Sequence, residues 1–402
     1  MQGGAPSLPS VLEDFIHGSE YLEAIDHGDI KDADTIVLLS LDGAQLYEHK
    51  QSDCWIYLWV VLDHSPDVRY KKKHVLVGGI IPGPNKPKNV DSFLFPGLHH
   101  VSALMCEGLS IWDAYTKAAY LSYLFLAYVT ADGPGMTYLN GEVGHQGACG
   151  CRLYCKQRGC LKSNSTHYYP ASKKPFDYNT PGSDFGDINL RTPPDPDGPD
   201  PQAEAVDRYQ RNLTYLLGSW NQIQYKHRRK ETGLAKPSIF MGLPSNRMFP
   251  LPGCFPANIM HLVALNIPEL LIKLWRGTLD CDDDDQKSTW DWVCLTGEKW
   301  KTHGAAVSDT RQYLPGFFHR PPRNPAKKIS SGYKAVEFLT YLFGLGPALL
   351  RGVLPDPYWA NFCKLVRGVR LLHQRRISDA EIHEAFRLLV EFIEEFEDLY
   401  YQ

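Results

Sequence analysis

The sequence lacks an apolar run long enough to cross a membrane, and it lacks a leader for secretion. Its longest apolar stretch, residues 118–130, is shorter than the roughly 20 residues of a membrane helix and is interrupted by Tyr, Ser and Thr. Residues 1–10 contain neither a basic nor an apolar segment, so no signal peptide is expected. These absences exclude a membrane partner and secretion.

Cysteine and net charge are also scarce. Ten cysteines among 402 residues are too few and too scattered for the disulfide framework of a small secreted protein. The formal net charge of −4 excludes a uniformly basic nucleic-acid coat, although not a local basic surface. With 43% hydrophobic residues, the chain is expected to bury a core, and its length suggests about two to three domains.

The first third of the chain alternates apolar runs with turn residues. Residues 35–43, 54–65 and 70–84 are β-branched and aromatic, which predicts three antiparallel strands joined by tight turns. Residues 90–116 have apolar positions three and four apart, which predicts a helix. Residues 118–135 fit a buried strand or a buried helix, and their last part has the composition of a strand. The order β-β-β-α-β predicts an α/β fold with an RNase H-like mixed sheet.

The rest of the chain is mainly helical in pattern, and Ser378 with Glu381 predicts a capped final helix. The composition divides the chain into five segments. They are an N-terminal extension (1–34), an RNase H-like catalytic core with a Cys-rich segment (35–169), a Pro/Asp-rich linker or loop (170–203), a mainly helical insertion (204–332) and a helical C-terminal region (333–402).

Two aspartates end predicted strands. Asp42 closes the first strand and Asp132 follows the fourth, and in an RNase H-like sheet these two strands are neighbours. Two nearby carboxylates repel each other unless a cation lies between them. Two divalent ions, Mg²⁺ or Mn²⁺, would there activate water for phosphodiester chemistry. The alternative is that both aspartates only form turns, because Asp-Gly is a common turn dipeptide.

Three further groups of residues are candidates for a role. Glu337, in an apolar helical stretch, is a candidate third acid, although it also fits a solvated helix edge beside Lys334. Cys151, Cys155 and His261 are candidate ligands of a structural Zn²⁺, with loose thiols and a core histidine as the alternatives. Basic residues that suit contacts with a DNA backbone, or simply a solvated face, are Lys71, Lys72, Lys73, Arg228 and Arg229. The run KHRRK at 226–230 also suits a nuclear-import patch.

Several long motifs carry a resemblance to a known family. They include SLDGAQLYEHKQSDCWIYLWVVLDHSPDVRYKKKHVLVGGIIPGPNKPKNVDSFLFPGLHH, TADGPGMTYLNGEVGHQGACGCRLYC, CFPANIMHLVALNIPELL and SGYKAVEFLTYLFGLGPALL. Roughly from Leu8 to its end, the chain resembles the transposase-like proteins of CACTA (En/Spm-type) DNA transposons, in the form found in mushroom-forming fungi. The resemblance implies a DDE-type transposase core with an RNase H-like fold, in which Asp42 and Asp132 are the first two acids.

The resemblance also implies roles for later residues, with departures. Cys151 and Cys155 correspond to half of a zinc site, but three residues separate them where the family has two. The family's element of an Asp followed three residues later by His corresponds to Asn258 and His261, and Asn carries no charge. The final acid, the paired histidines and the amino-terminal DNA-binding region of the family have no counterpart here, which predicts an incomplete or degenerate core.

The predicted function is therefore that of a DDE-type transposase core that cleaves DNA by two-metal hydrolysis and performs strand transfer. Its expected partners are transposon ends, and a second copy of itself or a full-length transposase, in the nucleus. The alternatives are a domesticated or relic module that binds DNA or protein without catalysis, and a stand-alone metal nuclease of the same fold.

Overall fold

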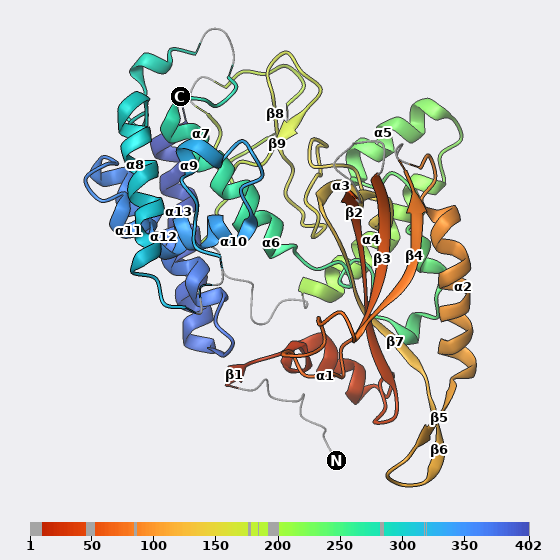
Figure 1. The fold of residues 1–402 in the computed structure, drawn as a ribbon. Helices are drawn as coiled ribbons and strands as arrows, with labels where there is room; N and C mark the ends of the chain where they lie inside the picture. The colour runs from red at the N-terminus through yellow and green to blue at the C-terminus, as the bar shows by residue number, and fades with distance from the viewer. Residues whose placement is uncertain are drawn as a thin grey trace.

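A computed structural model describes residues 10–45, 53–83, 87–175, 178–183, 185–191, 201–281, 285–316, 318 and 320–401. One half of the molecule is built on a four-stranded sheet, and the other is a group of packed helices (Figure 1). Parts of the predicted N-terminal extension and of the Pro/Asp-rich linker lie outside the described residues.

The central sheet has the strand order β4-β3-β2-β7. Its strands are β2 (Thr35–Gln45), β3 (Asp53–Val61), β4 (Val75–Pro82) and β7 (Leu124–Ala131). As predicted, the first three form an antiparallel meander, and the first strand lies beside the fourth, to which it runs parallel. The two adjacent strands are apolar because they bury side chains such as Leu39, Leu41 and Val129 in the first hydrophobic core, although β7 is an outer strand of the sheet.

Helix α2 (Asp91–Glu107) covers one face of this sheet and buries Leu94, Leu98 and Val101. Gly97 lets the helix approach closely, because a Cβ at this position would lie 2.7 Å from the Tyr57 hydroxyl oxygen. Figure 1 shows α2 running alongside the sheet next to β4.

The prediction of one helix over residues 90–116 is wrong beyond Glu107. Gly108 ends the helix with a φ of 76°, a left-handed conformation that glycine adopts without strain. The chain then forms a hairpin of β5 (Leu109–Asp113) and β6 (Ala118–Ser122) before it enters β7. The apolar residues of this segment fit the pleat of a hairpin as well as they fit a helix face.

The other elements are shorter strands and helices. The paired short strands are β1 (Val11–Leu12) with β10 (Ile377–Ser378), and β8 (Cys160–Leu161) with β9 (Tyr168–Tyr169). Helices on the sheet side are α1 (Ser19–Asp26), α3 (Gly133–Asn140), α4 (Pro201–Leu217) and α5 (Gln222–Thr232). The later helices are α6 (Ile259–His261), α7 (Ile267–Arg276), α8 (Gly297–Asp309), α9 (Pro325–Lys328), α10 (Ala335–Phe338), α11 (Gly346–Leu349), α12 (Asp356–Leu372) and α13 (Asp379–Tyr400). Two π-helical segments, Leu262–Asn266 and Leu339–Leu345, continue α6 into α7 and α10 into α11.

Two large hydrophobic cores lie in the described part of the chain. The first core runs from Ala24 to Phe255 and includes α4 and the region after α5, while the second runs from Val263 to Tyr400. Residues of the predicted helical insertion (204–332) contribute to both cores, and the five predicted segments stay a prediction. None of the helices in the described part of the chain combines the length and apolar composition that a membrane span requires.

Hydrogen bonds, ion pairs and a strand pairing connect the halves. The buried Glu397 carboxylate on α13 accepts hydrogen bonds from the Ser172 hydroxyl (2.6 Å) and from the backbone N–H groups of Ser172 and Lys173 (both 2.7 Å). Strand β1 pairs with β10, and Arg375 forms an ion pair with Asp67. Because the Glu397 carboxylate is satisfied by three donors, its burial is compensated, and the segment of Ser172 and Lys173 is fixed to the last helix.

Candidate functional site

The strand register places Asp42 next to the end of β7, where Asp132 follows. The prediction that Asp42 closes the first strand is wrong, because β2 continues to Gln45 and Asp42 pairs with Ile56 of β3. The parallel pairing of β2 with β7 ends at Leu41 and Ala131, and each aspartate is the next residue of its chain segment. Residues that follow a matched pair in parallel strands emerge side by side at the same edge. The side chain of Asp42 is exposed and that of Asp132 is half-buried, so both are open to a ligand.

A helix cap fixes the orientation of Asp132. One carboxylate oxygen, Oδ1, accepts a hydrogen bond of 2.6 Å from the backbone N–H of Gly135 in the first turn of α3. Glycine is needed there because a Cβ would lie 2.7 Å from that oxygen. The turn-forming role of Asp132 and a ligand role are compatible, since the cap uses one oxygen and leaves the other for a second partner.

Two further side chains, from distant parts of the sequence, border this edge. The Asn258 amide nitrogen donates to the backbone carbonyl of Ala131 at 2.9 Å, directly before Asp132. Its oxygen caps α6 by accepting from the backbone N–H of His261 at 3.1 Å. The guanidinium of Arg152 lies against Gly133, where a Cβ would meet its Nη2 atom at 2.6 Å. Arg152 was missed by the sequence analysis, because only the fold brings it beside Asp132.

Glu337 is placed in another environment. It lies on α10 in the second core with 0% of its surface exposed, so it is not on a solvated helix edge. The Arg323 guanidinium binds both carboxylate oxygens at 2.7 Å, and the backbone N–H of Lys334 adds a third bond. Burial raises the pKa of Glu337, but the bonds from Arg323 and from the backbone outweigh it and hold the pKa below its usual value.

No third acid joins Asp42 and Asp132 within the described residues. There, the structure brings together no group of three or more His, Cys, Asp and Glu side chains able to hold a metal ion. Glu337 is accordingly not grouped with the two aspartates, and its carboxylate already has partners. The two aspartates remain the acidic side chains on which a metal site can be built.

The thiols of Cys151 and Cys155 lie in contact. The Cys155 thiol donates to the sulfur of Cys151 and, against the effect of burial, lowers the pKa of the Cys151 thiol to about 6. The same contact raises the pKa of Cys155. His261 does not join them, and a tetrahedral zinc site needs four ligands. Zinc therefore does not fit the described residues here, because two thiols alone do not form such a site.

The sequence analysis also missed Glu142, a buried acid close to Cys151. Glu142 follows α3 and is 3% exposed, and its Oε1 has no hydrogen-bond partner. Burial, and then the nearby Cys151 sulfur, raise the pKa of Glu142 to about 9, although Arg152 opposes this shift. Burial therefore favours the protonated, neutral form of this carboxyl group.

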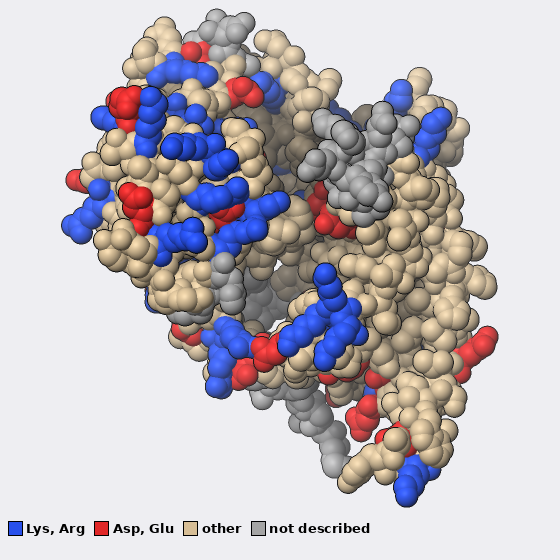
Figure 2. All heavy atoms as spheres, viewed as in Figure 1, with Lys and Arg blue, Asp and Glu red and all other residues tan. Residues whose placement is uncertain are grey.

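The predicted basic residues differ in their availability. Lys71, Lys72 and Lys73 are exposed between β3 and β4, and Arg229 is exposed on α5. Arg228 is half-buried, with its guanidinium 4.1 Å from the centre of the Tyr215 ring. Figure 2 shows Lys and Arg side chains gathered on the face of the helical half, across a hollow from the sheet half. These side chains place positive charge on the surface across the hollow from the sheet half.

Part of this chain is similar in sequence to a family of transposases. Residues 30–180 match the protein family described as Transposase family tnp2. The match includes both aspartates of the sheet edge and the Cys151–Cys155 pair, and it makes this part of the chain transposase-like. The comparison with curated proteins found no match.

Proposed function

We propose that this chain is a DDE-type transposase core with an RNase H-like fold, which cleaves and joins DNA at an Mg²⁺ site held by Asp42 and Asp132. The observation that carries the proposal is the parallel register of β2 and β7, which ends directly before both aspartates. The transposase family match over residues 30–180 supports the same reading, since it covers both of them.

The donor set fits a hard divalent cation. Asp42 and Asp132 offer carboxylate oxygens, and Mg²⁺ is commonly held by one or two carboxylates together with water and substrate phosphate. When bound, Mg²⁺ would polarise a phosphodiester and lower the pKa of a bound water molecule. The pair is exposed enough at Asp42 for a DNA strand to reach it.

Different residues of this chain have different roles in the proposed activity. Asp132 is oriented by its bond from Gly135, and the strand end before it is held by Asn258. The Arg152 guanidinium beside Gly133 is placed to attract a phosphate of the substrate. We assign transposon ends as the substrate, a second copy or a full-length transposase as the partner, and the nucleus as the site of action, where the exposed Lys226 and Arg229 would serve import.

Calorimetric titration with Mg²⁺ and Mn²⁺ tests the metal site. Binding by the full chain should vanish in the Asp42→Ala/Asp132→Ala double variant and persist in a matched control, Glu298→Ala/Asp309→Ala, which removes two acids of α8. Nicking of a supercoiled plasmid should follow the same pattern. Equal metal binding by the wild-type chain and the Asp42→Ala/Asp132→Ala variant would overturn the proposal.

A non-enzymatic module that binds DNA or protein is the second candidate. It is favoured by one observation: within the described residues no third acid stands with Asp42 and Asp132. For such a module, DNA affinity would be the same with and without Asp42→Ala/Asp132→Ala, and no nicking would be seen in either protein.

A further inference from the structure

Helix α5 exposes a continuous stripe of apolar and basic side chains. Ile223, Lys226, His227 and Lys230 follow the spacing of three and four residues that places side chains on the same helix face. All four are exposed, and Ile223 is 83% exposed. Trp220, three residues earlier in the turn from α4, is 92% exposed. The stripe therefore begins with two large apolar groups and continues with cations.

The helix is held firmly, so this face is a fixed surface. The Asn221 side chain caps its start by accepting from the backbone N–H groups of Ile223 and Gln224 at 3.0 and 2.9 Å. The opposite side of the helix packs on α4, where Arg228 stacks on Tyr215 and donates to its backbone carbonyl at 2.6 Å. Gly233 then ends the helix with a φ of 74°.

A basic cavity lies at the C-terminal end of the stripe. Its volume is about 440 Å³, and it is lined by Arg158, Gly182, Ser183, His227, Lys230 and Glu231. The acid among them already has partners: Glu231 accepts from the Tyr215 hydroxyl at 3.2 Å and lies 3.0 Å from His227 Nδ1. Lys230 Nζ lies 5.4 Å from the centre of the Tyr168 ring, and the Ser183 hydroxyl accepts from the Tyr178 hydroxyl at 2.8 Å, which leaves its own hydrogen to donate. The positive charges of Lys230 and Arg158 with this donor give the cavity the chemistry of a phosphate site.

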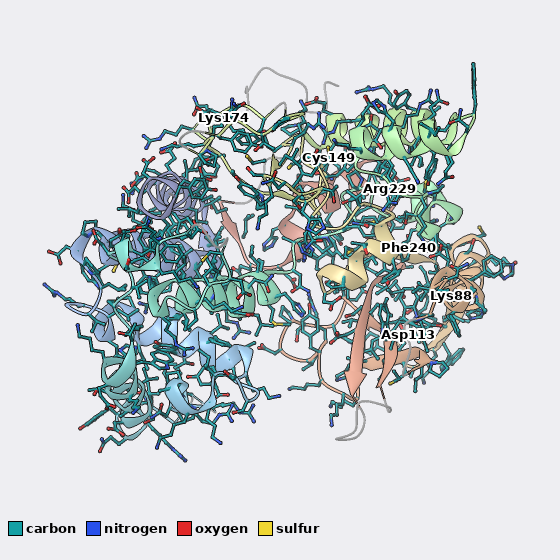
Figure 3. The ribbon with its side chains drawn as sticks, turned by 90° about the horizontal axis from the view of Figure 1, so that it is seen from above. Lys88, Asp113, Cys149, Lys174, Arg229 and Phe240 are labelled. Atoms are coloured by element: carbon teal, nitrogen blue, oxygen red, sulfur yellow. The ribbon has the colours of Figure 1, made fainter. Side chains whose placement is uncertain are left out.

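The end of α5 is connected to the segment that follows α3. The backbone N–H of Val143 donates to the carbonyl of Gly233 at 2.8 Å, and the Cys149 thiol contacts the carbonyl of Glu231 at 3.5 Å. Figure 1 shows α5 at the same end of the sheet as α3, and Figure 3 shows Cys149 and Arg229 on neighbouring segments. The α5 helix that carries this stripe therefore lies at the same end of the sheet as α3, which Asp132 caps.

We infer that the α4–α5 hairpin binds an unpaired DNA strand, with a base stacked on Trp220 and a phosphate in the cavity of Arg158 and Lys230. Ile223 and Lys230 are about 10 Å apart along the helix, at roughly 1.5 Å per residue. An aromatic side chain followed along the stripe by cations suits a base followed by phosphates. A base must be unpaired and unstacked before a side chain can stack on its face. The inference rests on the proposed function for its choice of DNA.

Fluorescence anisotropy tests it, with the full chain and a labelled 20-nucleotide single strand in EDTA. Trp220→Ala should weaken binding about 5- to 150-fold, which is the range for loss of one stacked base. The matched control Trp112→Ala removes a tryptophan that is 65% exposed on the β5–β6 hairpin and should leave affinity unchanged. The blunt duplex of the same sequence should respond less to Trp220→Ala than the single strand does.

Lys230→Glu gives an independent measurement. It should weaken binding of the single strand. The plot of log affinity against log salt should also become less steep, by the amount expected for the loss of about one phosphate contact. Lys88→Glu, an exposed lysine before α2, is the control for charge. Circular dichroism checks that each variant is folded. Equal effects of Trp220→Ala and Trp112→Ala, or no binding of the single strand by the wild type, would overturn the inference.

The two proposals fail separately, because this assay needs no metal. Strand binding that depends on Trp220, without any nicking, would keep the inference and remove the catalytic proposal. The opposite result is nicking that is lost in Asp42→Ala, with Trp220→Ala changing neither nicking nor strand binding. That result would keep the catalytic proposal and remove the inference.

Discussion

The side-chain amide of Asn258 donates to the carbonyl of Ala131 at 2.9 Å, one residue before Asp132. This bond joins the start of α6 to the end of β7, across more than a hundred residues of sequence. The amide oxygen at the same time caps α6. Asn supplies both a donor and an acceptor, whereas an ionised Asp supplies only acceptors. The residue is therefore suited to fixing the strand end, and its neutrality has a structural reason.

Asn258→Asp should destabilise the protein at neutral pH. The cap on α6 would be kept, but a carboxylate oxygen would face the Ala131 carbonyl without a hydrogen between them, at a cost of about 1–3 kcal/mol. Urea denaturation at pH 7 measures the loss. At a pH low enough to protonate the new carboxyl group, the deficit should shrink, since a protonated carboxyl can donate again. A gain of stability or of Mg²⁺ affinity at pH 7 would contradict the assigned role.

Glu142 should make the stability of the protein depend on pH. Burial raises its pKa from 4.5 to about 9, so the folded state holds a proton that the unfolded state releases between those values. The free energy of unfolding should therefore fall as pH rises through this window, by up to about 1.4 kcal/mol per pH unit. Glu142→Gln should flatten that dependence.

The control for this prediction is Glu298→Gln on α8, whose side chain is 83% exposed. It should leave the pH dependence of unfolding unchanged. Thermal denaturation at several pH values between 5 and 9 compares the three proteins. If the free energy of unfolding depended on pH in Glu142→Gln as it does in the wild type, another titratable group would be responsible for that dependence.

Glu337→Gln should lower stability without changing metal affinity. The substitution removes the charge that pairs with Arg323 while keeping most of the side-chain volume, and we expect a loss of about 1–3 kcal/mol. Glu384→Gln, which breaks the exposed pair with Arg367, should cost no more than about 1 kcal/mol. If Mg²⁺ affinity measured by calorimetry fell with Glu337→Gln, this acid would belong to the metal site after all.

Cys151 should be the more reactive thiol of its pair. The hydrogen bond from Cys155 lowers the pKa of its thiol and so favours the thiolate, which is the form that iodoacetamide alkylates. Mass spectrometry of the modified chain should show a rate that rises with a midpoint at lower pH than that of Cys363, whose pKa burial raises. Cys155→Ala removes the donor to Cys151 and should move the midpoint upward. A wild-type Cys151 midpoint at or above that of Cys363 would refute the contact between the thiols.

Much of the sheet could be predicted because its signals are local. The runs that became β2, β3 and β7 are apolar, β-branched and bounded by turn residues, and a meander followed by a crossover leaves few ways to arrange them. The hairpin of β5 and β6 was missed because apolar residues such as Leu109 and Ile111 fit either period, and the deciding signal was the left-handed Gly108.

The sequence by itself determined the four strands of the central sheet and the final capped helix, since each depends on residues close together in the chain. It also indicated that Asp42 and Asp132 lie on neighbouring strands, although β2 continues beyond Asp42 to Gln45. Only the tertiary structure decided which distant groups stand beside them. It placed Arg152 and Asn258 at the edge with Asp132, and it paired Glu337 with Arg323 in another core. Contacts of this kind depend on how whole helices pack, and packing is set by the shapes of both surfaces, which no local pattern of residues records.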